Sequence, residues 1–204
     1  MSWIRDLDER YGLSKLGWKK ALQYFIFQRM LRINGAVPWP VHWSSLIVHP
    51  ARIERIRPTG TLGGMPGCYI QAFNGIRFDQ HSLVGPGVKL ISSNHDVGNL
   101  CEYSREGPIN IGKHCWLGAN SIILPGVRLG DNTVVAAGAV VTKSCPDGNC
   151  VLAGVPAKVI RRIDPIDDAK LDRTRHQYCL HGVKGRERPS KGPLGSVEVR
   201  PRKG

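Results

Sequence analysis

The residues from Ile111 to Val141, IGKHCWLGANSIILPGVRLGDNTVVAAGAVV, decide the fold. Apolar residues stand at every sixth position of this stretch: Ile111, Leu117, Ile123, Leu129, Val135 and Val141. An α-helix needs a spacing near 3.6 and a flat strand a spacing near 2, so neither explains a period of six. A chain that turns a corner every six residues does, because each side points one aliphatic residue inward and a small neighbour such as Gly118 lets the backbone bend. Three sides close a coil, and stacked coils form a parallel β-helix.

The same spacing runs upstream through Ala72, Phe78, Val84 and Leu90. The next apolar position in the series, Ile111, lies 21 residues after Leu90, which is not a multiple of six. An insertion is therefore expected, and residues 96–108 (DVGNLCEYSREGP) read as a polar loop extruded from the coil directly after His95. Solenoids often carry such insertions on their functional face.

The composition is strongly basic, with 29 Lys and Arg against 16 Asp and Glu, a net charge of +13. The basic residues cluster near the two ends, and no zinc-finger, bZIP or RNP motif is present, which argues against nucleic acid as the partner. Anionic small molecules and membrane surfaces stay compatible with the charge. No apolar run approaches the ~20 residues of a membrane span. Six cysteines without a CxxC pair, and no signal peptide, favour a reduced cytoplasmic protein over one with a Cys145–Cys150 disulfide.

Three regions are expected: an N-terminal helical cap over residues 1–40, a β-helix over 41–163, and a basic, partly disordered tail over 164–204. The helical spacing near Leu22, Phe25 and Ile26 has two interpretations. The favoured one is a cap that packs on the first coil, which solenoids require. The other is a basic amphipathic helix over residues 15–33 that makes peripheral contact with an anionic membrane.

The segment SSNHD (residues 92–96) and residues 111–163, with the motifs WLG (116–118) and AGVPAK (153–158), closely resemble the hexapeptide-repeat acetyltransferases. The maltose, galactoside, nodulation-factor and surface-polysaccharide O-acetyltransferases are the nearest members. The resemblance covers residues 68–163. It implies a left-handed β-helix, a homotrimer with active sites between neighbouring subunits, acetyl-CoA as donor and no metal. The first 66 residues differ from those of the maltose and galactoside enzymes, which favours a polysaccharide or lipid-linked sugar precursor as acceptor.

By this resemblance His95 is the general base, which takes the proton from the acceptor hydroxyl as that oxygen attacks the thioester directly. The backbone N–H of Ala119 is implied as the oxyanion donor, and Trp116 and Asn74 as acceptor-site residues. The positions that match the CoA site of the family are Ala137, Thr142, Lys143, Lys158 and Arg161.

Within the CoA site, Lys158 and Arg161 are expected to pair with phosphates. The carboxylate that orients His95 is open among Asp96, Asp79 and Glu106.

Other functions stay open at this point. An N-acetyltransferase acting on an amino sugar, or a serine O-acetyltransferase, would use the same donor. A non-catalytic β-helix scaffold is disfavoured because His95, the loop and the CoA-end motif occur together. A zinc carbonic anhydrase is disfavoured as well, because His81, His95 and His114 lack the close histidine pair that such a site needs.

Overall fold

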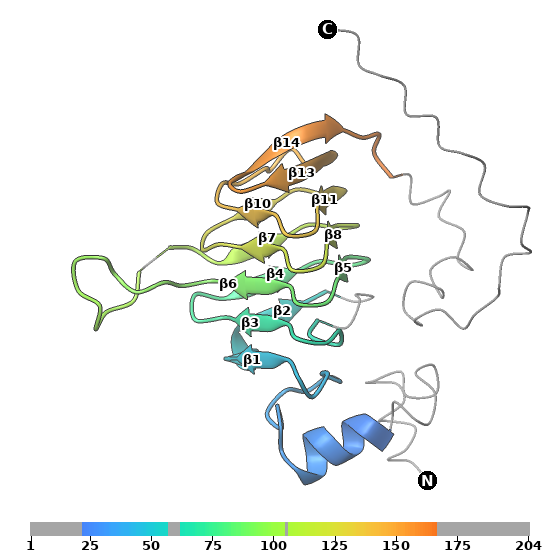
Figure 1. Ribbon diagram of the computed structural model, residues 1–204, viewed down its shortest axis with the longest axis vertical. Coiled ribbons are helices and arrows are strands. Elements are labelled where there is room, and N and C mark those ends of the chain that lie inside the picture. Colours follow the sequence, from blue (N-terminus) through green and yellow to red (C-terminus); the bar gives the residue numbers. More distant parts are fainter. Residues whose placement is uncertain (1–21, 57–61, 105, 167–204) are drawn as a thin grey trace, which may run out of the picture.

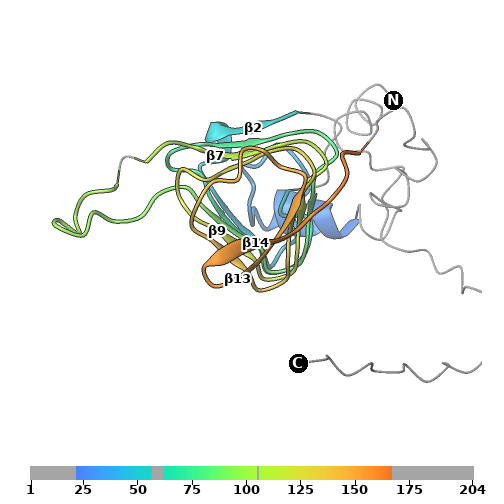
Figure 2. The same ribbon diagram turned by 90° about the horizontal axis from the view of Figure 1, so that it is seen from above.

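The computed structural model describes residues 22–56, 62–104 and 106–166, and these residues form a parallel β-helix (Figure 1). Three parallel sheets make the sides of a triangular tube, which Figure 2 shows in cross-section. Sheet A consists of β1 (Leu46–Val48), β3 (Tyr69–Gln71), β6 (Lys89–Ile91), β9 (Ile122–Ile123) and β12 (Val140–Val141). Sheet B consists of β2 (Ile53–Arg55), β4 (Ile76–Phe78), β7 (Ile109–Ile111) and β10 (Arg128–Leu129). Sheet C consists of β5 (Leu83–Val84), β8 (Trp116–Leu117), β11 (Thr133–Val135), β13 (Cys150–Gly154) and the antiparallel β14 (Ala157–Arg162).

The inward-pointing residues stack in register, which confirms the fold expected from the six-residue period. In sheet C, Leu117 lies between Val84 below and Val135 above. The six residues of the repeat are each at most 3% exposed. The repeat therefore supplies one buried aliphatic column per sheet, and burial of this apolar surface is what stabilises a fold with such short strands.

The glycines that follow the inward residues are required by the close approach of neighbouring coils. A Cβ placed on Gly118 would lie 2.7 Å from the backbone N of Ala137 and 2.7 Å from the carbonyl O of Val135. A Cβ on Gly85 would likewise lie 2.8 Å from the backbone N of Ala119. Neither neighbour can yield without moving the backbone, so the small residues set the spacing of the coils at this corner.

The three corners are named here by the sheets that they join: AB, BC and CA. Each coil repeats the same geometry at a given corner. At corner BC the structurally equivalent residues all have positive φ: His81, His114, Asn132 and Asn149. Asparagine tolerates this left-handed conformation better than most residues with a side chain. The corner thus accepts histidine in the lower coils and asparagine in the upper ones.

Two segments leave the regular stack. Residues 92–104 and 106–108, between β6 and β7, extend far out from corner AB (Figures 1 and 2). At the N-terminal end, residues 22–24 are α-helical and continue into a π-helix, η1 (Phe25–Met30), drawn in blue at the foot of Figure 1. A short 3₁₀ helix, η2 (Pro50–Arg52), joins β1 to β2. The first part of the expected cap (residues 1–21) and the expected basic tail from residue 167 on lie outside the described residues. In the described ranges no helix has the length and hydropathy of a membrane span.

Truncation of a large, fully buried side chain tests how far the column stabilises the fold. Phe78 in β4 is fully buried, so Phe78→Ala is expected to lower the free energy of unfolding by about 3–5 kcal/mol, through lost transfer energy and the cavity left behind. The matched control is Arg77→Ala on the same strand, whose side chain is half exposed and lies 3.9 Å from Asp79. That change is expected to cost about 1 kcal/mol or less. Denaturant unfolding at equal protein concentration measures both, and equal effects would contradict the assignment of the core.

Thiol reactivity provides a second test of the core. Burial raises the pKa of Cys115 to about 12 and also raises the pKa of Cys68, so both thiols stay protonated near neutral pH, whereas Cys101 is exposed on the loop. Only the thiolate attacks an alkylating reagent. Iodoacetamide is therefore expected to label Cys101 in the native protein and to spare the two buried cysteines. Peptide mass spectrometry, with the denatured protein as reference, measures the labelling; native labelling of Cys115 would contradict the packing.

Candidate active site

Corner AB holds two of the residues implicated by sequence, His95 and Asn74, at the base of the 92–108 loop. The backbone N–H of Asn74 donates to Ser92 Oγ (2.9 Å), and its side-chain amide donates to the carbonyl O of Ser104 (3.1 Å). His95 forms an antiparallel bridge with Tyr103 on the returning arm of the loop. These contacts hold both arms of the loop against the coil below, so the backbone at His95 is fixed where the loop leaves the β-helix.

The imidazole of His95 is the outermost member of a series of aromatic rings. It stacks on Tyr103, with ring centroids 4.7 Å apart and planes at 30°. Tyr103 stacks on Phe73 with ring centroids 4.8 Å apart, and Phe73 and His49 form a T-shaped pair with centroids 4.4 Å apart. The stack restricts the plane of the imidazole while leaving His95 exposed to a ligand. Tyr103 was not singled out from the sequence; an aromatic residue in an otherwise polar loop was the available signal.

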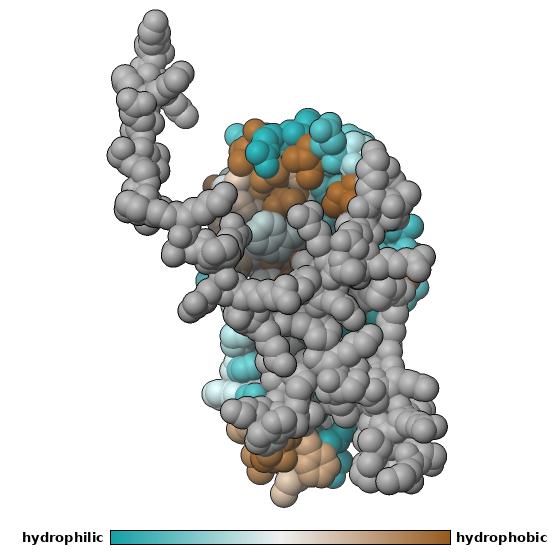
Figure 3. All heavy atoms as spheres, turned by 90° about the vertical axis from the view of Figure 1, so that its right-hand side faces the viewer, coloured by the Kyte–Doolittle hydropathy of each residue, from teal (hydrophilic) through white to brown (hydrophobic). Residues whose placement is uncertain are grey.

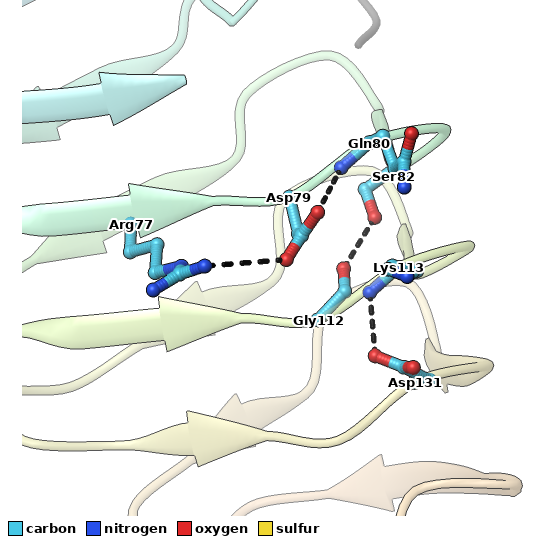
Figure 4. A network of polar contacts seen from close by, with 7 residues as sticks. All are labelled: Arg77, Asp79, Gln80, Ser82, Gly112, Lys113 and Asp131. Atoms are coloured by element: carbon cyan, nitrogen blue, oxygen red, sulfur yellow. Dashed lines mark hydrogen bonds and ion pairs between the residues drawn. The ribbon is translucent and has the colours of Figure 1, made fainter. Parts of the chain in front are cut away.

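None of the three candidate carboxylates is hydrogen-bonded to His95 among the described residues. Asp96 Oδ1 accepts from the N–H groups of Gly98 (2.7 Å) and Asn99 (3.1 Å) and so shapes the loop turn. Glu106 accepts a hydrogen bond from Ser104 Oγ. Asp79 lies at corner BC, where it faces Arg77 at 3.9 Å and accepts from the N–H of Gln80 (Figure 4). Ring stacking, rather than a carboxylate, is the contact that the described residues make with the imidazole.

Apart from Asp79, corner BC carries none of the implicated residues, and polar contacts join its successive coils (Figure 4). Ser82 Oγ donates to the carbonyl O of Gly112 (2.6 Å), and the N–H of Lys113 donates to Asp131 Oδ1 (2.8 Å). These bonds join successive coils. In the described part of the chain, no three His, Cys, Asp or Glu side chains are grouped as a metal site would require.

Corner CA supplies backbone donors in the upper coils only. The equivalent positions, from the lowest coil upward, are Pro66, Pro86, Ala119 and Ala137. Each of the first three accepts a hydrogen bond at its carbonyl O from the next coil: Pro66 from the N–H of Gly87, Pro86 from that of Asn120, and Ala119 from that of Gly138. Proline has no N–H. The N–H groups of Ala119 and Ala137 donate to no acceptor among the described residues. Two N–H groups without an acceptor in the described chain therefore lie one coil apart at corner CA, and Trp116 of β8, three residues before Ala119, is exposed.

The remaining CoA-site candidates lie higher in the stack. Thr142 and Lys143 are exposed and follow β12 at corner AB, above His95. Lys158 and Arg161 are exposed on β14, opposite Ala153 and Val151 of β13. A three-residue interval would place two side chains on opposite faces of a regular strand. The register of the hairpin shifts between Val151 and Leu152, so Lys158 and Arg161 pair with Ala153 and Val151, which are two residues apart on β13. Residues two apart on a strand point to the same face, and Lys158 and Arg161 therefore share a face as well.

The implicated residues thus separate into two groups at different places on one chain. His95, Asn74, Thr142 and Lys143 lie at corner AB; Ala119 and Ala137 lie at corner CA, and Trp116 lies on sheet C in β8, which leads to that corner. One side of a coil, about five extended residues, is about 16 Å long, whereas a general base must come within about 3 Å of its proton. A base and an oxyanion donor must act on the same carbonyl group, and His95 and the N–H of Ala119 of one chain stand at corners too far apart for that. Two copies can meet this requirement, by apposing corner AB of one to corner CA of the other.

Comparisons with known proteins agree with the fold and point to a family. The sequence model described as the hexapeptide repeat of succinyl-transferase matches residues 108–143. The galactoside O-acetyltransferase of Escherichia coli (strain K12) is 42% identical over 99 residues, which are 47% of this chain and 45% of that protein. The galactoside O-acetyltransferase of Lactococcus lactis is 39% identical over 92 residues, 43% of each.

Solved structures give the same result. A galactoside acetyltransferase in complex with coenzyme A superposes with a TM-score of 0.51 and 25% identity over 74% of this chain and 82% of the other. A maltose O-acetyltransferase from Clostridium difficile 630 gives a TM-score of 0.51 and 27% identity over 59% and 64%. The match spans less than half the length of the two galactoside O-acetyltransferase sequences, so it concerns the β-helix.

Proposed function

We infer that this chain, which belongs to the hexapeptide-repeat acetyltransferase family, transfers an acetyl group from acetyl-CoA to a hydroxyl group of a saccharide. The observation that carries the proposal is the distribution of the site over two corners. One corner offers an exposed, ring-stacked histidine and the other offers free backbone donors. A base and an oxyanion donor are the two groups that direct acyl transfer to an alcohol needs from a protein.

The chemistry follows from these two groups. His95 takes the proton of the acceptor hydroxyl while the hydroxyl oxygen bonds to the thioester carbonyl carbon. The N–H of Ala119 donates to the carbonyl oxygen as it becomes negative. The tetrahedral intermediate then collapses, the carbon–sulfur bond breaks, and the CoA thiolate takes the proton from the imidazolium. No residue of the chain is acylated in this sequence.

The upper coils fit CoA in chemical character. The N–H of Ala137, which has no acceptor among the described residues, is a donor for an amide carbonyl of the pantetheine arm. Lys143 at the end of β12, and Lys158 with Arg161 on one face of the β13–β14 hairpin, supply positive charge for the phosphates. Lys158 contributes charge without the two-pronged contact that an arginine makes.

The proposed acceptor is a saccharide, as the names of the galactoside and maltose O-acetyltransferase relatives suggest. The finer proposal is a polysaccharide precursor. Its support is the N-terminal 66 residues, whose sequence does not follow those two enzymes. Thiol release from acetyl-CoA, measured with galactosides, maltose and nucleotide sugars, tests both the saccharide acceptor and the narrower proposal of a polysaccharide precursor. Acceptor-dependent release supports the reaction; no release from any acceptor, together with no binding of acetyl-CoA, would overturn it.

We propose a homotrimer with sites shared between subunits, because a closed ring of copies apposes corners AB and CA at every interface. Co-expression of His95→Ala with Ala119→Pro subunits tests the shared site. Each variant alone lacks one half of every site, whereas random mixing leaves both halves intact at roughly a quarter of the interfaces. Activity should therefore return to that fraction of wild type. No recovery in isolated mixed oligomers would contradict sharing.

A further inference from the structure

Two cysteine side chains, Cys145 and Cys150, meet in the last coil of the β-helix. Cys145 lies in register with Leu129 of sheet B, and Cys150 begins β13 of sheet C, so the two stand on either side of corner BC. Their sulfur atoms are 3.2 Å apart, and both thiols are free. Among the five described cysteines, this is the pair whose sulfur atoms are in contact. No step of the acetyl-transfer chemistry uses either thiol.

Backbone hydrogen bonds to the coil below hold both ends of the turn between the two cysteines. The N–H of Cys145 donates to the carbonyl O of Arg128 (2.8 Å), and its carbonyl O accepts from the N–H of Gly130 (2.9 Å). At the other end of the turn, the N–H of Asn149 donates to the carbonyl O of Asp131 (2.8 Å). A covalent bond between two sulfurs is about 2 Å long, so the two atoms need to approach by only about 1 Å. The backbone thus brings the sulfurs together before any bond joins them.

The two thiols differ in their exposure to solvent. Cys150 is fully buried, whereas Cys145 is partly exposed. Burial and the neighbouring sulfur of Cys145 raise the pKa of Cys150 to about 11, although the positive charge of Arg162 opposes the shift. Near neutral pH Cys150 therefore stays protonated, and its S–H is available to donate to the sulfur of Cys145. Cys145 is the member of the pair that a reagent from solvent meets first.

The position of the pair leaves it open to small molecules. It lies in the last parallel coil of the described chain, next to the antiparallel β14. Figure 3 shows hydrophilic and hydrophobic surface together at the upper end of the stack, where Val159, Ile160 and Arg161 of β14 are exposed. Corner BC takes no part in the apposition of corners AB and CA. A ring of copies built through those two corners therefore leaves the pair accessible.

We propose that Cys145 and Cys150 are a redox modification site, which forms a reversible disulfide by exchange with a small disulfide such as glutathione disulfide. The thiolate of Cys145 attacks one sulfur of glutathione disulfide, and the first glutathione leaves and takes up a proton. Cys150 then gives up its proton and attacks Cys145 Sγ, and the bond from Cys145 to the second glutathione breaks. The two protein thiols lose two electrons and two protons, which the small disulfide gains. A reducing thiol reverses both steps.

This inference does not rest on the acetyl-transfer proposal, and its effect on the fold is local. The bond closes the last coil across corner BC, directly before the β13–β14 hairpin. Terminal units of a stack open more readily than internal ones, because they have a neighbour on one side only. The oxidised protein is therefore expected to hold its C-terminal end closed more firmly than the reduced protein.

Disulfide mapping of the native full-length protein tests the proposal. Trypsin leaves both cysteines in one peptide, residues 144–158, which a bridge makes lighter by two hydrogens; cleavage before Asp147 then yields two fragments that the bridge still joins. The bridge is expected after incubation with glutathione disulfide and absent after reduction with dithiothreitol. Cys101, exposed on the loop, is the matched control and is expected to keep a glutathione adduct. A bridge from either member of the pair to Cys101 or Cys179, an adduct that persists on Cys145, or an unmodified pair would overturn the proposal.

Two variants separate the steps of the exchange. Cys150→Ala leaves Cys145 without its partner, so Cys145 is expected to retain one glutathione until dithiothreitol is added. An unmodified Cys145 in this variant, with circular dichroism that shows an unchanged fold, would contradict its role as the first thiol to react. Cys145→Ser changes the more exposed cysteine, and its buried Cys150 is expected to take up no glutathione.

Thermal unfolding reports the effect of the bridge on the coil. The oxidised wild type is expected to unfold a few degrees above the reduced wild type, because the bridge restricts the unfolded chain. Cys145→Ser is expected to unfold at the same temperature before and after treatment with glutathione disulfide. An unfolding temperature of the wild type that does not rise with the bridge in place would contradict the pre-arranged geometry of the pair.

Discussion

His95→Ala is expected to lower kcat for acetyl transfer by a factor of about 10²–10⁴, the usual contribution of a general base. The loss arises because an alcohol is a poor nucleophile until its proton is removed. Binding of acetyl-CoA should change little, since His95 lies at the base of the loop and the phosphate-binding candidates lie in the upper coils. Thiol release gives the rate, and calorimetry with CoA gives the affinity. A variant within about threefold of wild type would remove His95 from the mechanism.

The control for this variant is another histidine of the same stack. His81 lies at corner BC, outside the two-corner site, and Asn132 and Asn149 occupy the equivalent position with the same positive φ. His81→Asn therefore preserves the corner conformation, and it is expected to keep the activity within a small factor of wild type. A comparable loss of kcat in both variants would indicate a general structural effect of histidine replacement. The loss in His95→Ala could then not be assigned to removal of a general base.

Ala119→Pro is expected to lower kcat by a factor of about 10²–10³, the cost of one missing oxyanion donor. Proline removes the N–H and nothing else that this corner needs, because Pro86 and Pro66 hold the equivalent position in the coils below. Gly118 precedes residue 119 as Gly85 precedes Pro86, so the preceding residue tolerates proline as well. The unfolding temperature is therefore expected to stay near that of wild type.

The comparison that isolates the donor is Ala119→Gly, which keeps the N–H and loses only a methyl group. Its kcat should exceed that of the proline variant by at least about tenfold. If both variants lost activity equally, the methyl group rather than the N–H would be the required feature. If Ala119→Pro were fully active, the oxyanion would have to be held by another donor, and Ala137 one coil above would be the next to replace.

Much of this arrangement could be predicted from the sequence because it repeats. The period of six identified the buried column, and the interval from Leu90 to Ile111 located the extruded segment. What repetition does not determine is local geometry at single positions. Tyr103 stacks on His95 through the folding of the loop, which follows no period. Lys158 and Arg161 share a face only because one irregularity shifts the register of the hairpin, and no residue pattern announced it.

The N-terminal helix illustrates a different limit. The helical spacing of Leu22, Phe25 and Ile26 favours a face that packs on the coil below, since apolar stripes usually point to a core. The structure turns this face outward, because the hydrogen bonds of Gln28 outweigh it in setting the rotation. A buried polar residue with several backbone partners cannot be distinguished in sequence from a solvated one. Hydrophobic periodicity therefore predicted the helix but not its orientation.

Strand β14 has a consequence for solubility as well as for ligands. A stack of parallel coils exposes unpaired backbone groups at its last coil, and such an edge can recruit the first coil of another molecule into a filament. The chain reverses direction after Val155, so the final strand of sheet C runs against the others and offers no matching register to a parallel newcomer. Lys158, Arg161 and Arg162 add like charge along that rim. The strand proposed to hold phosphates thus also covers the C-terminal edge of sheet C, where it disfavours end-to-end polymerisation.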